Sequence, residues 1–573
     1  MVRPTFVALT LLALVVPTTL AFALPPVPQV RGPSGPADVM GVWEAPFDGQ
    51  APAVNMVLLR DGKVLYWSGV EAGQNDGVFF TGTPVDAQSR VWDPATGIVS
   101  TPADPEGAAG DLFCSGQTIL PDGRVLTAGG SDWQTLPGSA LASADAAQQG
   151  QAQDPWPIVN GLKDARAFDP ATGAWTRVAD MGVGRWYPTV MELPDGSALA
   201  VSGIQNLTDP RTMDTLLETY SAGADLWHPV AGADHLLPMY PRLFVVPSGP
   251  LKGQLFYETD ATLWGPFGER PEEGLWSLEQ AYDPATNAWS YLGPSEFGAR
   301  QHGATVMLPL DPSDGYTARL LTLGGTLQRS VVATPASEVT TLGPEGVTHA
   351  ATGLLNHARW FPNGVLLPDG SVLAVGGGLI DNVVAHGQRS PPVMDAEQFD
   401  LATGQWQERA SMDVPRTYHS TAILLPDGRV LSGGHVPLPM PWTAVRDDVP
   451  YEDQIAETRL QIYDPPYLFW GHRPVISEAP SRVGYGEPFK VETPNATEVQ
   501  DVMLVHPGAT THAWDAAERA VVLPVERRDS DGVWVRAPPD ADVAQPGDWM
   551  VFLRTHVEGK GDVPSVAAFT HLS

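Results

Sequence analysis

A short phrase recurs along the chain and constrains its fold more than any other feature. Each copy places an Asp-Gly pair between two apolar runs, which is the sequence signal of a β-hairpin because Gly takes the positive φ of a tight turn. The copies are "LPDGRVLTAGG" at 120–130, "LPDGSALAVSG" at 193–203, "LPDGSVLAVGG" at 367–377 and "LPDGRVLSGG" at 425–434, with looser ones at 59–69 and 313–325. The chain is therefore built from repeated hairpins.

A second phrase follows at a distance and predicts an outer hairpin that ends on an aromatic residue. Its copies are "VWDPATG" at 91–97, "FDPATGAW" at 168–175, "YDPATNAW" at 282–289 and "FDLATGQW" at 399–406. A degenerate copy of the first phrase, "VVPSGPLKGQLFYE" at 245–258, fills the widest gap, which gives seven units of roughly 55 to 73 residues. Four short strands, a Gly-Gly pair and a closing aromatic are typical of kelch-type blades, whereas a parallel solenoid has shorter and more uniform repeats. We predict an all-β fold with a seven-bladed kelch-type β-propeller over 42–465.

The repeat stops after "YDPPYLFWGHRP". Alternating strands over 473–573 instead predict a C-terminal immunoglobulin-like β-sandwich of the early-set type. At the other end, Arg3, the apolar run 6–16 and Ala21-Phe22-Ala23 are typical of a secretion signal over 1–23, followed by a Pro-rich leader over 24–41. We expect the mature chain to be secreted or periplasmic; a retained N-terminal anchor is the alternative.

The charge balance excludes some partners. Lys and Arg total 33 against 66 Asp and Glu, a formal net charge of -33, and no basic cluster stands out. Nucleic acid and anionic membrane surfaces are therefore poor candidates, and we expect a monomer that acts on small molecules.

One position in the repeat carries unusual residues. Eight residues before each turn Asp, or before Ser248 in its place, stand Cys114, Tyr187, Tyr240, Phe361 and His419. The innermost strand of each blade begins here, so these residues should ring one mouth of the central channel. Each residue has an ordinary explanation alone. A lone cysteine is usually a small buried apolar residue, a tyrosine at a channel mouth usually has a solvent-exposed hydroxyl, and a histidine is usually hydrogen-bonded to its neighbours. Together they bring redox-active and metal-binding side chains to one site.

Five pieces in order resemble the copper radical oxidases, the galactose oxidase and glyoxal oxidase family, over essentially the whole mature chain. They are "FCSGQTILPDGRVLTAGG", "GRWYPTVMELPDG", "RTYHSTAILLPDGRVLSGG", "YDPPYLFWGHRPVI" and "GATTHAWD". The resemblance implies a Cys114–Tyr187 thioether, which would account for the single cysteine of the chain. It also implies one copper held by Tyr187, Tyr418, His419 and His512.

The resemblance implies a reaction as well. Tyr418 would accept the proton of the substrate hydroxyl, the Tyr187 radical would take hydrogen from carbon, and O2 would leave as hydrogen peroxide. Because ideal strand neighbours point to opposite faces, Tyr418 and His419 can serve one ion only if the backbone is irregular there. Tyr240 and Phe361 are expected beside the copper without binding it.

Two points stay open from sequence. Galactose oxidase stacks a tryptophan on the linked tyrosine where this chain has Gln205, so the stacking group is expected to be Trp264, Trp186 or another residue. The substrate is the second. The phrase "RWYPTV" and the absence from this sequence of a carbohydrate-binding domain before the propeller favour small aldehydes such as glyoxal or methylglyoxal. Primary alcohols, including galactose, and a non-catalytic glycan-binding propeller are the alternatives. Loops 131–160 and 204–216 are expected to set specificity.

Overall fold

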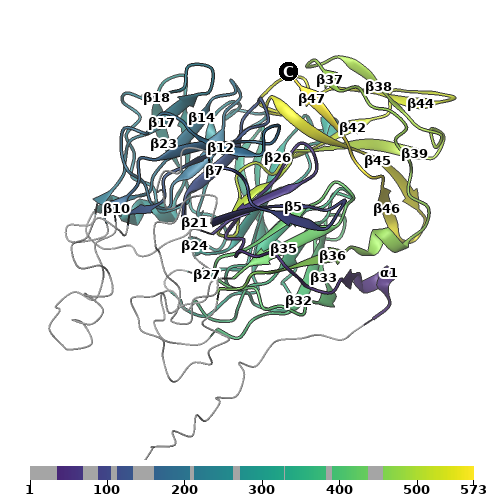
Figure 1. The fold of residues 1–573 in the computed structure, drawn as a ribbon, viewed down its shortest axis with the longest axis horizontal. Coiled ribbons are helices and arrows are strands. Elements are labelled where there is room, and N and C mark those ends of the chain that lie inside the picture. The colour runs from purple at the N-terminus through teal and green to yellow at the C-terminus, as the bar shows by residue number, and fades with distance from the viewer. Residues whose placement is uncertain are drawn as a thin grey trace, which may run out of the picture.

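Seven four-stranded antiparallel blades follow one another along the chain in the computed structural model (Figure 1). The structure describes residues 35–68, 88–104, 112–132, 160–206, 212–261, 271–327, 330–381, 390–435 and 456–573. The predicted signal, 1–23, and most of the predicted leader lie outside these ranges. Among the described residues, no helix has the length and apolarity needed to cross a membrane.

The blades run from the channel outward in chain order. Blade one is β3 (Asn55–Leu58), β4 (Val64–Trp67), β5 (Ser89–Asp93) and β6 (Ile98–Ser100); blade two is β7 (Gly116–Ile119), β8 (Val125–Ala128), β11 (Ala165–Asp169) and β12 (Ala174–Arg177). Blade three is β13 (Thr189–Glu192), β14 (Ala198–Val201), β17 (Glu218–Ser221) and β18 (Leu226–Pro229); blade four is β19 (Arg242–Val245), β20 (Leu255–Glu258), β22 (Glu279–Asp283) and β23 (Ala288–Gly293). Blade five is β25 (Ala304–Met307), β26 (Ala318–Leu323), β28 (Ser337–Gly343) and β29 (Gly346–Ala351); blade six is β30 (Asn363–Leu366), β31 (Val372–Val375), β32 (Asp395–Asp400) and β33 (Gln405–Ser411).

Blade seven closes the ring with a strand from the other end of the propeller. It joins β34 (Ser420–Leu424), β35 (Val430–Gly434) and β36 (Arg459–Asp464) to β1 (Val42–Trp43), with Val42 opposite Asp464. The short β2 (Phe47–Asp48) also pairs with β36, and α1 (Ala37–Met40) precedes β1. The closure ties the first described residues of the propeller to its last strand.

Smaller elements lie between the blades. One small sheet contains β9 (Ser131–Asp132), β10 (Asn160–Gly161), β15 (Ile204–Asn206) and β16 (Thr212–Met213). A second small sheet contains β21 (Asp260–Ala261), β24 (Arg300–Gln301) and β27 (Thr326–Leu327). Short 3-10 helices are η1 (Pro271–Ser277), η2 (Pro312–Asp314) and η4 (Pro466–Phe469).

The C-terminal domain is a two-sheet sandwich, drawn in yellow and yellow-green beside the propeller (Figure 1). One sheet contains β37 (Arg482–Val483), β47 (Ala568–Leu572), β45 (Gly547–Val557), β39 (Val499–Val505), β42 (Ala520–Pro524) and β46 (Gly561–Pro564). The other contains β38 (Pro488–Glu492), β44 (Gly532–Arg536) and β43 (Arg527–Asp529). The predicted fold class, an all-β propeller followed by an early-set sandwich, is confirmed.

The recurring Asp-Gly phrase makes the turn that its chemistry predicts. In blade six Gly370 has φ 91°, its N–H donates to Leu367 O at 2.9 Å, and Asp369 Oδ1 accepts from Ser371 N at 3.0 Å. A residue with a Cβ is strained in this conformation, which explains the glycine.

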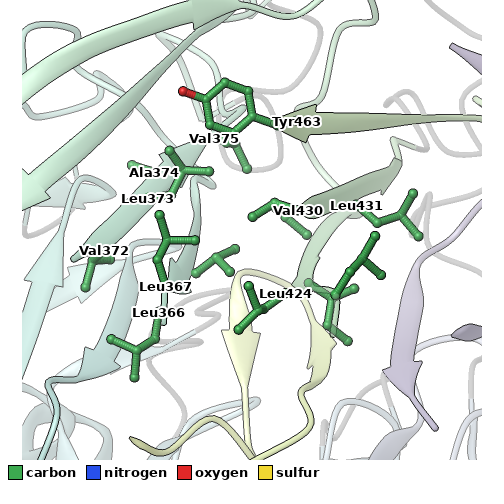
Figure 2. Close-up of a cluster of buried hydrophobic side chains, with 14 of the residues drawn as sticks. Leu366, Leu367, Val372, Leu373, Ala374, Val375, Leu424, Val430, Leu431 and Tyr463 are labelled. Carbon is green, nitrogen blue, oxygen red and sulfur yellow. The ribbon is translucent and has the colours of Figure 1, made fainter. Parts of the chain in front are cut away.

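The apolar runs flanking these turns form the core between blades. Figure 2 shows part of the cluster shared by blades six and seven, including Leu366, Val372, Leu373, Leu424, Val430 and Leu431. The closing aromatics of the second phrase add to it: Trp406 donates from Nε1 to Ser337 Oγ of the preceding blade at 2.9 Å. Packing between blades therefore uses both repeated phrases.

Candidate metal centre

The innermost strands begin with residues in the left-handed backbone region. The φ angles are 56° at Cys114, 64° at Tyr187, 45° at Tyr240, 55° at His302, 59° at Phe361 and 64° at His419. This conformation is uncommon for residues other than glycine and costs about 1–2 kcal/mol, so its recurrence in six blades marks a structural position that the fold enforces.

Hydrogen bonds between neighbouring blades hold this position. The Tyr187 N–H donates to Cys114 O at 3.0 Å, and the Tyr240 N–H donates to Tyr187 O at 3.0 Å. In the same way the Phe361 N–H donates to His302 O at 2.7 Å. The residues predicted from the eight-residue spacing therefore do lie at equivalent places around the channel.

His302 is the member of this ring that the spacing missed. Blade five has a longer hairpin, in which η2 lies between β25 and β26, so His302 precedes Asp314 by twelve residues instead of eight. A second signal could have found it. Buried Arg185, Arg300 and Arg359 stand two residues before Tyr187, His302 and Phe361. Arg300 and Arg359 donate to the carbonyls of Gly324 and Gly376, which directly follow the second strands of their blades.

Three metal-binding side chains converge on the channel axis. Cys114 Sγ lies 3.5 Å from His512 Nε2 and 4.0 Å from His419 Nε2. All three side chains are fully buried, and their ligand atoms lie within 4.8 Å of one another. Among the described residues, these form the one group of three or more His, Cys, Asp and Glu side chains close enough to hold a metal ion.

A hairpin from the sandwich delivers His512 to this point. Its strands are β40 (Ala509–Thr511) and β41 (Trp514–Asp515), and β40 pairs with β3 of blade one, Thr511 opposite Asn55. Thr511 Oγ1 lies 2.7 Å from His512 Nδ1, and Arg242 Nη2 donates to His512 O at 2.9 Å. Because Nδ1 is engaged by the hydroxyl, Nε2 faces Cys114 as the free nitrogen.

Electrostatics keep that imidazole neutral. Burial, followed by His419, Arg242 and His302, lowers the pKa of His512 well below its ordinary value. A neutral imidazole offers its lone pair to a metal, so the site favours metal binding over protonation.

Two phenols complete the donor set. Tyr187 Oη and Tyr418 Oη lie 2.7 Å apart, and both side chains are fully buried. Burial, the Cys114 thiol and Tyr418 raise the pKa of Tyr187 well above its ordinary value. Burial and then Cys114 raise the pKa of Tyr418, while a hydrogen bond with Tyr187 opposes the shift. Phenols in this setting ionise only when a cation compensates the charge.

Cys114 and Tyr187 are neighbours, since the Tyr187 N–H donates to Cys114 O at 3.0 Å and the thiol contributes to the raised pKa of Tyr187. Tyr418 and His419 both reach the site, with ring centroids 3.8 Å apart, because the left-handed His419 breaks the alternation of the strand.

Rings surround Tyr187 edge-on. Trp186, Tyr240 and His512 have centroids 4.7, 5.0 and 4.9 Å from it, at interplanar angles of 71°, 67° and 73°. Trp186 thus contacts the ring without stacking on it. Gln205, from β15, donates its amide to Asp214 Oδ1 at 3.2 Å. Trp264 lies outside the described residues, as do 133–159 and 207–211 of the expected specificity loops.

Tyr240 and Phe361 pack beside the donor set. The Tyr240 hydroxyl donates to Ser115 O at 2.9 Å, and its ring lies 4.8 Å from that of His512. Phe361 meets Tyr418 edge-on at 4.9 Å.

The donor set fits copper. Two imidazoles and two phenol oxygens are ligands that Cu(II) accepts. The residues at the site are those that the sequence resemblance implied.

Known proteins match most of this chain. Residues 473–572 match the family model "Galactose oxidase-like, Early set domain". Galactose oxidase of Gibberella zeae is 26% identical over 566 residues, which cover 94% of this chain and 72% of the relative. Aldehyde oxidase GLOX of Vitis pseudoreticulata is 27% identical over 503 residues, covering 81% and 82% respectively. The predicted resemblance to the copper radical oxidase family is confirmed by these relatives.

A solved structure gives the same fold. A novel fungal alcohol oxidase of the AA5 family, in complex with copper, superposes with a TM-score of 0.69 at 22% identity and covers 93% of this chain and all of its own. The predicted class of a copper radical oxidase, an oxidoreductase that uses O2, is confirmed by the family and by the presence of Cys114, His419 and His512.

Proposed function

We propose that this copper radical oxidase oxidises small aldehydes, as their hydrates, to carboxylic acids. The balanced reaction is RCH(OH)2 + O2 → RCOOH + H2O2, in which the hydrate loses two hydrogens and dioxygen gains them. The observation that carries the proposal is the buried meeting of Cys114, Tyr187, Tyr418, His419 and His512 on the channel axis.

The aldehyde preference has support from one of the relatives. The grapevine aldehyde oxidase matches over similar shares of both chains, 81% and 82%. Primary alcohols are the second candidate, because galactose oxidase and an alcohol oxidase are also similar to this chain.

Copper would be held by His419, His512, Tyr187 and Tyr418. When bound, it supplies one of the two electron acceptors that a two-electron oxidation needs. Tyr418, whose hydroxyl lies 2.7 Å from that of Tyr187, is placed to take the proton of the substrate hydroxyl. Tyr187 supplies the second one-electron acceptor, as a phenoxyl radical that takes the hydrogen atom from carbon.

We further propose that Cys114 Sγ bonds to the Tyr187 ring beside its hydroxyl. The thiol and the ring each lose one hydrogen as the C–S bond forms, and O2 in the presence of copper accepts both. The closeness of the two residues in the fold supports this bond. We also propose that the chain acts after export, on the basis of its first 23 residues, and as a monomer.

The experiment is a peroxide assay on copper-loaded protein with glyoxal, methylglyoxal, ethylene glycol and galactose. The proposal expects peroxide and the corresponding acid, with aldehydes giving the higher kcat/KM. A folded, copper-loaded protein that yields no peroxide from either class would contradict it and favour the glycan-binding alternative.

A further inference from the structure

His302 lies in the ring of site residues, yet neither the metal donors nor the phenol pair uses its side chain. The imidazole is fully buried, and its centroid lies 6.1 Å from that of Tyr418 and 5.9 Å from that of Phe361. Its left-handed backbone matches that of Cys114 and Tyr187. His302 therefore lies on the Tyr418 side of the site, where the substrate hydroxyl would be deprotonated.

A buried carboxylate lies beside this imidazole. His302 Nδ1 lies 3.2 Å from Asp381 Oδ2, and both side chains are fully buried. The Asp381 N–H donates to Val331 O at 2.8 Å, which holds the backbone of the carboxylate in place. Because a carboxylate only accepts hydrogen bonds, this contact favours the tautomer with the hydrogen on Nδ1, in which Nε2 is an acceptor, although the two atoms are not aligned for a hydrogen bond.

That acceptor has no hydrogen-bond partner among the described residues. The neighbouring Trp360 is in the same state: its Nε1 donor is buried and, within the described part of the chain, unpartnered. The Trp360 ring lies 5.6 Å from that of His302 and stacks on Tyr418 at 5.8 Å and 24°. A buried polar group without a hydrogen-bond partner costs about 1–3 kcal/mol of stability, so two such groups side by side, His302 Nε2 and Trp360 Nε1, indicate a site for a polar ligand.

We propose that His302, held by Asp381, accepts a hydrogen bond from the second hydroxyl of a hydrated aldehyde and so makes the site prefer aldehydes to primary alcohols. This inference rests on the proposed function and names the residue that sets its substrate class. A hydrate carries two hydroxyls on the reacting carbon, whereas a primary alcohol carries one. With the first hydroxyl at Tyr418, only the hydrate has a second one to offer Nε2. A site built to bond a hydroxyl discriminates against substrates that lack it.

Three variants test the proposal, and one serves as a matched control. His302→Phe keeps a ring but removes the acceptor, His302→Gln retains an acceptor, and Asp381→Asn presents an amide that can donate to Nδ1 and leave the hydrogen on Nε2. The control is His235→Phe, in which the lost imidazole stacks on Trp289 of the outermost strand of blade four. Glyoxal, which is hydrated in water, and ethylene glycol share a two-carbon skeleton, and only the hydrated glyoxal carries two hydroxyls on its reacting carbon.

We expect His302→Phe to lose about tenfold or more in kcat/KM for glyoxal, mainly through KM, and less than about threefold for ethylene glycol. His302→Gln should recover part of the preference, and Asp381→Asn should behave like His302→Phe. His235→Phe should match the wild type. All four variants should keep the copper content of the wild type, and each should be lighter than its own sequence mass by the same two hydrogen atoms.

A binding measurement removes the dependence on turnover. Trifluoroacetone hydrate is a gem-diol whose central carbon has no hydrogen to lose, so it binds without reacting. Calorimetry should show its Kd weakened about tenfold in His302→Phe and unchanged in His235→Phe. Equal losses on glyoxal and ethylene glycol, or an unchanged Kd, would overturn the role of His302 while leaving the oxidase intact. A wild type that makes no peroxide would instead refute the proposed function, and the calorimetry would still decide what His302 binds.

Discussion

The proposed bond between Cys114 and Tyr187 should stabilise the fold by an amount that follows from its place in the chain. It would close a loop that contains β7 to β12 and the blade-two hairpins. A cross-link over about 70 residues removes roughly 4 kcal/mol of chain entropy from the unfolded state at 25 °C. The two residues are already neighbours in the folded state, where the Tyr187 N–H donates to Cys114 O at 3.0 Å.

The assay compares two copper-free samples of the same protein. One is exposed to copper and air and then stripped by a chelator, and the other never meets copper. The exposed sample should be lighter by two hydrogen atoms and should unfold at a higher urea concentration. Cys114→Ser taken through the same cycle is the control and should show no change in mass or midpoint.

Coincident urea midpoints for two samples that differ in mass would refute the loop argument. A Cys114 thiol that is still alkylated freely after full copper loading in air would refute the bond itself. In that event the stability of the site would depend on copper alone.

Three further outcomes are expected. His512→Ala should lose most of the copper bound per chain, measured by elemental analysis, while circular dichroism stays native; unchanged affinity would exclude the sandwich hairpin as a ligand arm. Glu279→Gln should flatten the pH dependence of stability, because burial and then Glu258 and Glu338 raise the pKa of Glu279 to about 10. Protonated Glu279 contributes its full stabilisation below about pH 4.5, and this contribution is lost as pH rises towards 10, at up to about 1.4 kcal/mol of unfolding free energy per pH unit. Near pH 9 the variant should therefore resist urea better than the wild type. Parallel plots of unfolding free energy against pH for the two proteins would contradict this. Leu373→Ala, in the core between blades six and seven, should lower the free energy of unfolding of the propeller by about 3 kcal/mol, and a loss below about 1 kcal/mol would mean that the blades repack around the cavity.

Much of the fold was predictable because the same turn residues recur between the two inner strands of successive blades. Gly370 and its equivalents need a positive φ, and that need is visible in each Asp-Gly pair. The same spacing placed Cys114, Tyr187 and His419 in one ring. The prediction missed His302 because a longer hairpin in blade five shifts the count without moving the strand in space.

Other parts of the site were beyond sequence reasoning for physical reasons. The tautomer of His302 depends on Asp381, which lies 79 positions further along the chain and close only in the fold. The edge-on contact of Trp186 depends on ring orientation, which adjacency to Tyr187 does not determine. His512 could be proposed from family resemblance alone, since the pairing of β40 with β3 that brings its hairpin to the propeller links segments far apart in the sequence.

The delivery of His512 by that hairpin has a consequence for the order in which the protein matures. Blades one to seven are complete when β36 is made, yet the last ligand is synthesised some way after it, within a domain that must first dock on the propeller. A nascent or truncated chain can therefore hold Cys114, Tyr187, Tyr418 and His419 without a finished copper site. On the proposed ligand set, radical chemistry would begin only once both domains are in place, so a partly folded chain would not be exposed to its own oxidant.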